Sequence, residues 1–326
     1  MTIRGFKGFE EDLRCKNQQY EIGGTVSVDG DLEMCYNGLH FCLNPICTFA
    51  YYSPSYARYG VVRTNEPVLE EPEGQYYTTK CCARELTVEK EITAVDIAYE
   101  GVNWVREHAK DGPNVYTEKY CEDTISVTTE PDECGYWMQA STLLLATNKG
   151  SCVVNNAGSI ALTLARFSVA MCTGTWRAAA IAHGSQSAAV SQCSGSVCVT
   201  MGCDSVAVAE GEDSVAFVGA ASIAIVKGRN SVGMALFRGS KIRLEADGCM
   251  AMALGPVEVI GKGCVVMLAN GYDKKATIKS VKGTRLLIPF LDTATYTEII
   301  CGESPAWPDG VECPYVNIME NFLKNV

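Results

Sequence analysis

Four residues near position 40 have side chains of the types that bind zinc. They are Cys35, His40, Cys42 and Cys47. His40 and Cys42 are two positions apart, so in a β-strand both side chains point to the same face. The spacing matches none of the paired C-x-x-C patterns of structural zinc sites. We therefore expect small, buried strand residues here and assign no metal ion to the chain.

General acid-base chemistry has few candidate residues. The chain contains 3 histidines, His40, His108 and His183. We expect His108 near a helix end and His183 beside a turn, which are structural positions. The sequence contains no defensible Ser/His/Asp arrangement, P-loop or dinucleotide fingerprint. We assign no catalytic residue and no cofactor.

The N-terminal section, residues 1–138, predicts an α+β module. Alternating apolar positions between residues 20 and 36, separated by Gly-Gly and Asp-Gly, predict two or three short antiparallel strands. Asn44 followed by Pro45 predicts a capped short helix. The best helical pattern of the chain follows Thr93, which can cap it.

Residues 139–270 repeat the pattern G-x-x-S-V-A, and Gly, Ala, Ser and Val dominate their composition. A serine column recurs at intervals of nine, broken once by ten and once by eight, at Ser159, Ser168, Arg177, Ser187, Ser196, Ser205, Ser214, Ser222 and Ser231. These intervals predict nonapeptide repeats. Three residues before this column lies a glycine-rich column, which predicts a turn that needs positive φ.

Small residues, mostly alanine, stand two positions after the serines, and bulky apolar residues flank them. In a strand, the small residues and their flanking neighbours point to opposite faces. Two repeats make one coil, and stacked coils make two parallel sheets. The pattern therefore predicts a parallel β-roll, a form of β-solenoid, followed by a small β-rich cap over residues 271–326.

The face on which the bulky columns lie decides whether the roll needs a partner. If they lie inside, the roll is a monomer. If the small columns fill the interior, the bulky columns form an outer apolar face too large to leave in water. We favour the second arrangement, with identical subunits around an axis. The expected interface residues are Val206, Val208, Val215, Phe217, Ile223, Ile225, Val232 and Met234.

Charge and composition exclude several classes of partner. The formal net charge of -11 is spread along the chain and repels nucleic acid phosphates. The first residues carry charges throughout, unlike a secretory signal, and no stretch is apolar for long enough to span a membrane. The 17 cysteines are odd in number, which favours reduced thiols inside a cell.

Two known groups of proteins share these patterns. The G-x-x-S-V-A repeat resembles the head repeats of trimeric autotransporter adhesins of the YadA type, which are left-handed parallel β-rolls. The runs GFKGFEEDLRCKNQQYEIGG and DLEMCYNGLHFCLNPICTFAYY are similar to an uncharacterised family encoded by phages and prophages, as are GCVVMLANG and IKSVKGTRLLIP. These resemblances imply a phage origin, a trimer, and a location in the host cytoplasm or the virion.

The segment GLHFCLNPICTFAYY, which contains His40, is also similar to the strand and helix that hold nicotinamide in ADP-ribosyltransferases. The resemblance implies that Arg4 or Lys7 contacts the cofactor and that Tyr51 or Tyr52 stacks on it. The sequence lacks the upstream His-Gly and the Ser-Thr-Ser strand of those enzymes. The equal candidates for a catalytic glutamate are Glu85, Glu89 and Glu91.

We expect a non-enzymatic binding or structural protein that oligomerises through its β-roll. Its partner is an unknown host or viral protein or a small nucleotide ligand, and its role is inhibition of a host defence, virion attachment or capture of a nucleotide signal. The expected binding residues are Arg4, His40, Tyr51 and Tyr52. The alternative is a mono-ADP-ribosyltransferase that acts on a host protein.

Overall fold

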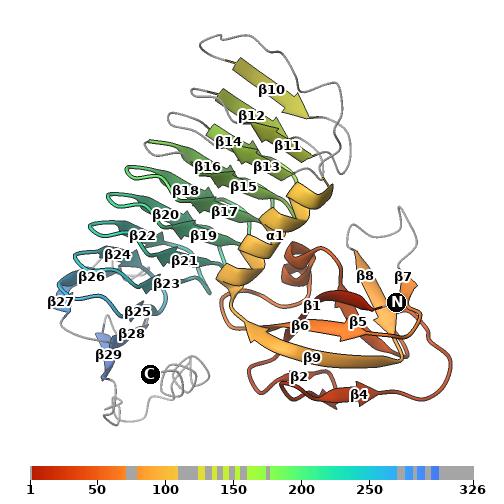
Figure 1. Cartoon of the computed structure of the whole chain (residues 1–326). Coiled ribbons are helices and arrows are strands. Elements are labelled where there is room, and N and C mark those ends of the chain that lie inside the picture. The colour runs from red at the N-terminus through yellow and green to blue at the C-terminus, as the bar shows by residue number, and fades with distance from the viewer. Residues whose placement is uncertain are drawn as a thin grey trace.

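The computed structural model joins an antiparallel sheet module to a long β-solenoid (Figure 1). The structure describes residues 2–70, 79–108, 124–128, 134–137, 142–146, 151–154, 160–173, 177–269, 276–281, 285–290 and 295–300. In this part of the chain, neither helix has the length and apolar character that a membrane crossing requires.

The N-terminal module is built on a seven-stranded antiparallel sheet of order β4-β9-β6-β1-β5-β8-β7. Its strands are β1 Ile3–Phe9, β4 Thr25–Ser27, β5 Leu39–Cys42, β6 Arg58–Thr64, β7 Leu69–Glu70, β8 Lys80–Ala83 and β9 Glu85–Ile92. A small hairpin of β2 Arg14–Cys15 and β3 Gln18–Gln19 lies beside β1. The sheet is larger than the two or three strands expected from residues 20–36, where only β4 forms.

Two helices follow the strands that they pack against. The first is the 3-10 helix η1, Pro45–Ala50, and the Asn44 side chain caps it by accepting from Ile46 N at 3.0 Å. The second is α1, Ala94–His108, where Asp96 N donates to Thr93 Oγ1 at 3.2 Å. Both predicted helix starts are confirmed.

The solenoid consists of two ten-stranded sheets, and it makes about 6 turns between residues 160 and 268. We call the first the open sheet; it contains β10 Thr124–Thr128, β12 Thr142–Ala146, β14 Ile160–Thr163, β16 Ala179–Ala182, β18 Val197–Thr200, β20 Val215–Val218, β22 Val232–Ala235, β24 Met250–Ala253, β26 Cys264–Ala269 and β27 Ala276–Val281. We call the second the covered sheet; it contains β11 Cys134–Trp137, β13 Ser151–Val154, β15 Val169–Cys172, β17 Ala188–Ser191, β19 Val206–Ala209, β21 Ile223–Val226, β23 Lys241–Leu244, β25 Val257–Val259, β28 Arg285–Phe290 and β29 Thr295–Ile300.

Both ends of the solenoid extend beyond the predicted boundaries of 139 and 270. At the N-terminal end, β10 and β11 pair in parallel with β12 and β13, so the sheets begin at Thr124. At the C-terminal end, β27, β28 and β29 continue the two sheets with antiparallel pairing. The rest of the predicted cap, which includes residues 301–326, lies outside the described residues.

Small residues fill much of the interior of the solenoid, as predicted, whereas larger side chains such as Val218, Ile242 and Leu244 join them in the later coils. Fully buried alanines and a cysteine line it at Ala161, Ala170, Ala180, Ala189, Cys198, Ala207, Ala216 and Ala224. Serine hydroxyls beside them link successive coils: Ser187 N donates to Ser205 Oγ at 3.2 Å, and Ser205 N donates to Ser222 Oγ at 3.0 Å. Arg177 does not occupy the serine column, because Ala180 pairs with both Ala161 and Cys198.

The glycine column has a different physical cause from the one expected. Gly211 and Gly228 do not have positive φ; a Cβ at Gly211 would overlap the carbonyl of Cys193 in the preceding coil. The left-handed residues stand instead just before the serines, as at Asp204 and Asp213, both with φ 54. The glycines are needed because stacked backbones touch at this corner.

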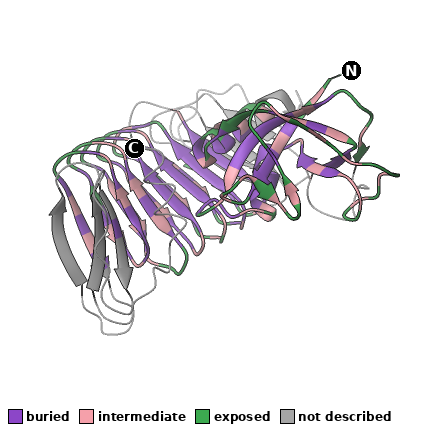
Figure 2. Ribbon diagram, turned by 90° about the horizontal axis from the view of Figure 1, so that it is seen from below, coloured by how far each residue is buried: buried purple, intermediate pink, exposed green. Residues whose placement is uncertain are grey.

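Helix α1 lies along the outer face of the covered sheet (Figure 1). Val206, Val208, Ile223 and Ile225 belong to one buried cluster with residues of α1 and η1, including Val102 and Ile46. A Cβ at Gly101 would lie 2.6 Å from Ile46 Cγ1, so this glycine lets α1 approach η1. The chain itself therefore covers four of the eight residues expected at a subunit interface. Figure 2 shows the buried strands of the solenoid and its more exposed turns.

Candidate functional site

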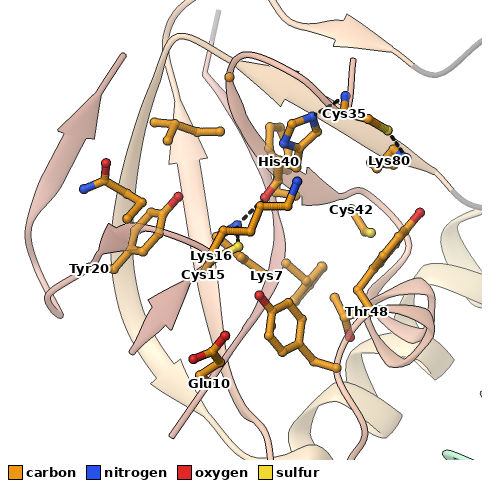
Figure 3. Close-up of a pocket in the computed structure, with 18 of the residues that line it drawn as sticks. Lys7, Glu10, Cys15, Lys16, Tyr20, Cys35, His40, Cys42, Thr48 and Lys80 are labelled. Atoms are coloured by element: carbon orange, nitrogen blue, oxygen red, sulfur yellow. Dashed lines mark hydrogen bonds between the residues drawn. The ribbon is translucent and has the colours of Figure 1, made fainter. Parts of the chain in front are cut away.

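A cavity of about 810 Å³ opens in the N-terminal module. Strands β1, β5 and β8, hairpin β2–β3 and the segments 35–38 and 51–56 contribute to its wall (Figure 3). Its volume is in the range of small-molecule sites, about 300–1,000 Å³. Five tyrosines line it: Tyr20, Tyr36, Tyr51, Tyr52 and Tyr56. The cavity therefore offers many flat ring surfaces.

Lys7 of β1 is a buried amine on the cavity wall, with 4% of the residue exposed. Its Nζ donates to His40 O at 2.7 Å and to Cys15 Sγ at 3.3 Å, and lies 5.1 Å from the ring centroid of Tyr20. Among the described residues, no carboxylate forms an ion pair with Lys7. Burial lowers the pKa of Lys7 below its ordinary value. The site thus holds a cation without an acidic partner in the described chain.

Lys80 of β8 is a second buried amine on the same wall, with 8% of the residue exposed. Its Nζ donates to Cys35 Sγ at 3.2 Å and lies 5.4 Å from the ring centroid of Tyr51. The backbone N–H of Cys35 donates to His40 Nε2 at 3.0 Å. His40 Nε2 is therefore the acceptor of this hydrogen bond, and the imidazole orients the loop that carries Cys35.

The tyrosines differ in exposure, and we infer their roles in the site from this difference. Tyr51 and Tyr56 are 46% and 51% exposed, so their rings are accessible at the cavity mouth. Burial raises the pKa of Tyr20 and of Tyr52, so both phenols stay neutral at physiological pH. Tyr59 Oη donates to Tyr52 O at 2.6 Å and fixes the backbone there. These rings provide surfaces for stacking rather than charge.

The structure brings together three of the four predicted binding residues. His40, Tyr51 and Tyr52 line the cavity, whereas Arg4 is outside it. Arg4 Nε lies 3.2 Å from Glu89 Oε2, in an exposed ion pair. Of the two cations proposed for the first strand, only Lys7 reaches the cavity.

Sequence reasoning missed Lys80, Cys15 and Tyr20 as residues of the site. A signal for Lys80 was available: it opens the run KCCA of residues 80–83, all four of which are buried. A lysine in a buried strand is rare unless it has a local partner or a function. Cys15 and Tyr20 come from the hairpin region, where the sequence contains no comparable signal.

The candidate glutamates of the transferase alternative do not line the cavity. Glu10 is the one carboxylate among the described lining residues. Glu89 and Glu91 of β9 form ion pairs instead, and Glu91 Oε2 lies 2.6 Å from Arg58 Nη2. Glu85 also lies on β9, where it pairs with Ser27 of β4. The structure therefore separates these glutamates from the tyrosines.

The residues considered for zinc have surroundings that do not suit a metal site. Cys42 and Cys47 are buried, and burial raises the pKa of Cys42 well above its ordinary value, which disfavours a thiolate ligand. Within the described part of the chain, no three His, Cys, Asp or Glu side chains form a group that could hold a metal ion.

Comparison with known proteins identifies one part of the chain. Residues 3–100 match the model of a domain of unknown function, DUF7666. A search of curated proteins and a search of solved structures found no match. The matched segment includes every described residue that lines the cavity. The candidate site is thus a feature of the segment that resembles this domain family.

Proposed function

We propose that the N-terminal module is a non-enzymatic binding module whose cavity takes a small anionic ligand with a flat ring, a nucleotide being the chemistry that fits best. The observation that carries the proposal is Lys7, a buried ammonium group on the cavity wall that has no ion-paired carboxylate among the described residues. A phosphate placed there would supply the missing negative charge at low dielectric.

The tyrosines supply the second half of the recognition. A nucleobase has a π-face, and stacking on an aromatic side chain contributes about 1–3 kcal/mol per base. Tyr51 lies 5.4 Å from Lys80 Nζ, so a stacking surface and a cation adjoin each other. A ligand that bridges them satisfies both requirements of the site at once.

The test is isothermal titration calorimetry of the full chain with a panel of nucleotides, in reducing and oxygen-free buffer. We expect one or more nucleotides to bind, and Lys7→Met to weaken that binding about tenfold or more, because a charge-assisted hydrogen bond is lost. The matched control is Lys90→Gln, an exposed lysine on β9.

Tyr51→Ala gives a second readout, because this ring is 46% exposed and its removal spares the core. We expect weaker binding of nucleotides than in the parent protein and no change for inorganic phosphate. Absence of binding by every nucleotide, or equal affinity in Lys7→Met, overturns the proposal. Circular dichroism of each variant checks that it is folded.

We further propose that the open sheet joins copies of this chain. Val215, Phe217, Val232 and Met234 point outward from it and stay half-exposed. Val197 and Met250 on neighbouring strands are 39% and 42% exposed, so the apolar face continues along the sheet. Apolar faces of this extent mark interaction sites, and the other sheet already has its cover in α1.

The remaining parts of the proposal rest on the resemblances. The nonapeptide repeat and the likeness to YadA-type heads favour three copies, and the phage resemblance favours action in the host cytoplasm or in the virion. Several cavities on one particle would raise the capacity for a nucleotide signal, which suits inhibition of a host defence. The oligomeric state is the part that can be tested first.

Light scattering coupled to size-exclusion chromatography measures the oligomeric state. We expect an oligomer for the parent protein and a monomer for the double variant Val197→Glu with Met250→Glu, because it places charges on the apolar face. The matched control is Arg229→Glu, an exposed residue at a turn. A parent protein that stays monomeric at all concentrations overturns the interface.

A further inference from the structure

Two lysine–cysteine pairs face the same cavity. Lys7 Nζ lies 3.3 Å from Cys15 Sγ, and Lys80 Nζ lies 3.2 Å from Cys35 Sγ. Both lysines are more than nine-tenths buried. Cys15 is half-buried and Cys35 is exposed, and both line the cavity, which gives dissolved oxygen a path to the two pairs. Each amine is thus held against a thiol that an oxidant can reach (Figure 3).

The two pairs share one topology. Each lysine lies on a strand of the seven-stranded sheet, Lys7 on β1 and Lys80 on β8. Each cysteine lies on a segment of the cavity wall outside that sheet. Cys15 belongs to hairpin β2–β3, and Cys35 precedes β5 with φ 71, a left-handed conformation that is uncommon outside glycine. A bond within either pair would tie a wall segment to the sheet beside the cavity.

We propose that Lys7 and Cys15 are a modification site, at which dioxygen joins the two side chains by a nitrogen–oxygen–sulfur bridge, and that Lys80 and Cys35 are a second site of the same kind. One oxygen atom is inserted between nitrogen and sulfur. The amine loses one hydrogen and the thiol loses one hydrogen, and both leave in water with the second oxygen atom. Nitrogen and sulfur together give up the four electrons that reduce dioxygen.

The surroundings of Lys7 suit this reaction. The amine must offer a lone pair, and burial lowers the pKa of Lys7, which raises the fraction of molecules in which this amine is neutral. No carboxylate pairs with it among the described residues, so the thiol and the carbonyl oxygen of His40 are its recorded polar neighbours. The first oxidised form of a thiol is reversible, so a thiol reductant would return the pair to its starting state.

The modification would regulate the cavity. A bridged nitrogen is no longer an ammonium group, so the two buried cations of the wall, Lys7 and Lys80, are lost while the two segments are locked. This consequence rests on the proposed function, whereas the bridge itself does not. Oxidised protein would then bind nucleotides more weakly than reduced protein, and reduction would restore the affinity.

Tryptic peptide mapping of the full chain tests the bridge directly. Protein is prepared without oxygen and divided, and one half is exposed to air before both are denatured and digested. Trypsin does not cleave after a bridged lysine, so GFKGFEEDLR, residues 5–14, stays intact around Lys7 and remains joined to the dipeptide of Cys15 and Lys16. We expect this joined product, heavier by one oxygen and lighter by two hydrogens than its two parts, only in the aerated half.

Variants locate the bond. Cys15→Ser should abolish the joined product, and Cys35→Ser should leave it unchanged. Cys203 is the control thiol, since it is exposed but its Sγ lies 3.4 Å from Ser185 Oγ rather than beside an amine. It should carry no bridge under the same conditions.

Two outcomes overturn the inference. One is cleavage after Lys7 in the aerated half with Cys15 recovered as thiol or sulfinic acid, and the other is a disulfide of Cys15 with another cysteine. Titration calorimetry of the oxygen-free half with nucleotides shows whether the bridge or the proposed nucleotide site is at fault. Nucleotide binding without a bridge overturns only the modification, and a bridge without binding overturns only the nucleotide site.

Discussion

Substitution of Gly211 by alanine tests how the solenoid stacks. A Cβ at this position would lie 2.6 Å from Ser194 N, whereas ordinary van der Waals contact begins at 3.4 Å. The contact with Ser194 N alone requires the two coils to separate locally by about 0.8 Å, and the overlap with the carbonyl of Cys193 requires more. Hydrogen bonds between them, such as Gly195 N to Glu212 O at 2.8 Å, then exceed the limit of about 3.5 Å.

The magnitude follows from these contacts. Overpacking costs about 1–3 kcal/mol and each weakened hydrogen bond about 1 kcal/mol, so we expect Gly211→Ala to lower the free energy of unfolding by about 3–5 kcal/mol. The control is Gly195→Asn, because Gly195 has φ +65 and its Cβ would meet only Arg177 Cγ at 3.6 Å. Asparagine tolerates this backbone, and the expected loss is about 1 kcal/mol.

Urea denaturation followed by circular dichroism measures both variants, and amide hydrogen exchange locates the effect. We expect faster exchange in the coils on either side of Gly211 than elsewhere in the solenoid. A loss in Gly211→Ala no greater than that in Gly195→Asn would show that contact between stacked backbones is not the reason for the glycine column.

Three further predictions concern the helix caps, the covered face and the cavity. Asn44→Ala should lower the melting temperature by the equivalent of about 1 kcal/mol, because the side chain caps η1 at Ile46 N; calorimetry that finds no change would contradict the cap. Ile225→Ala should cost about 2–5 kcal/mol in urea denaturation because it is buried under the N-terminal module, whereas Ile181→Ala on the open sheet should cost about 0.5 kcal/mol in dilute protein. Nucleotide affinity should fall as pH rises, with a midpoint below 10.5, because burial lowers the pKa of Lys7 and only its ammonium form attracts phosphate; calorimetry that shows constant affinity up to that pH would contradict it.

The sequence predicted the solenoid well because the solenoid depends on a pattern of residues that are close together in the chain. Alternation of small and bulky residues in each strand identifies the two faces, and the structure places alanines such as Ala207 and Ala216 inside. It could not predict what covers the bulky face, since the buried cluster that contains Val208 joins β19 to α1, which is far away in the chain. The expectation of a subunit contact at Val208 failed for this reason.

The candidate site was predicted only in part, also for a physical reason. His40, Tyr51 and Tyr52 came from one continuous segment with a visible aromatic pattern. Lys7 and Lys80 reach the site because antiparallel pairing places β1 and β8 on either side of β5. The residues next to either lysine do not indicate such long-range pairing. A single sequence therefore does not reveal that Lys7 and Lys80 lie on one cavity.

The nucleotide site can be seen directly in a crystal structure of the oxygen-free protein with the nucleotide that binds it most tightly. We expect a phosphate within hydrogen-bond distance of Lys7 Nζ and a base stacked on a tyrosine of the cavity. A nucleotide bound elsewhere on the chain, with the cavity empty and Lys7 still bonded only to His40 O and Cys15, would contradict this expectation.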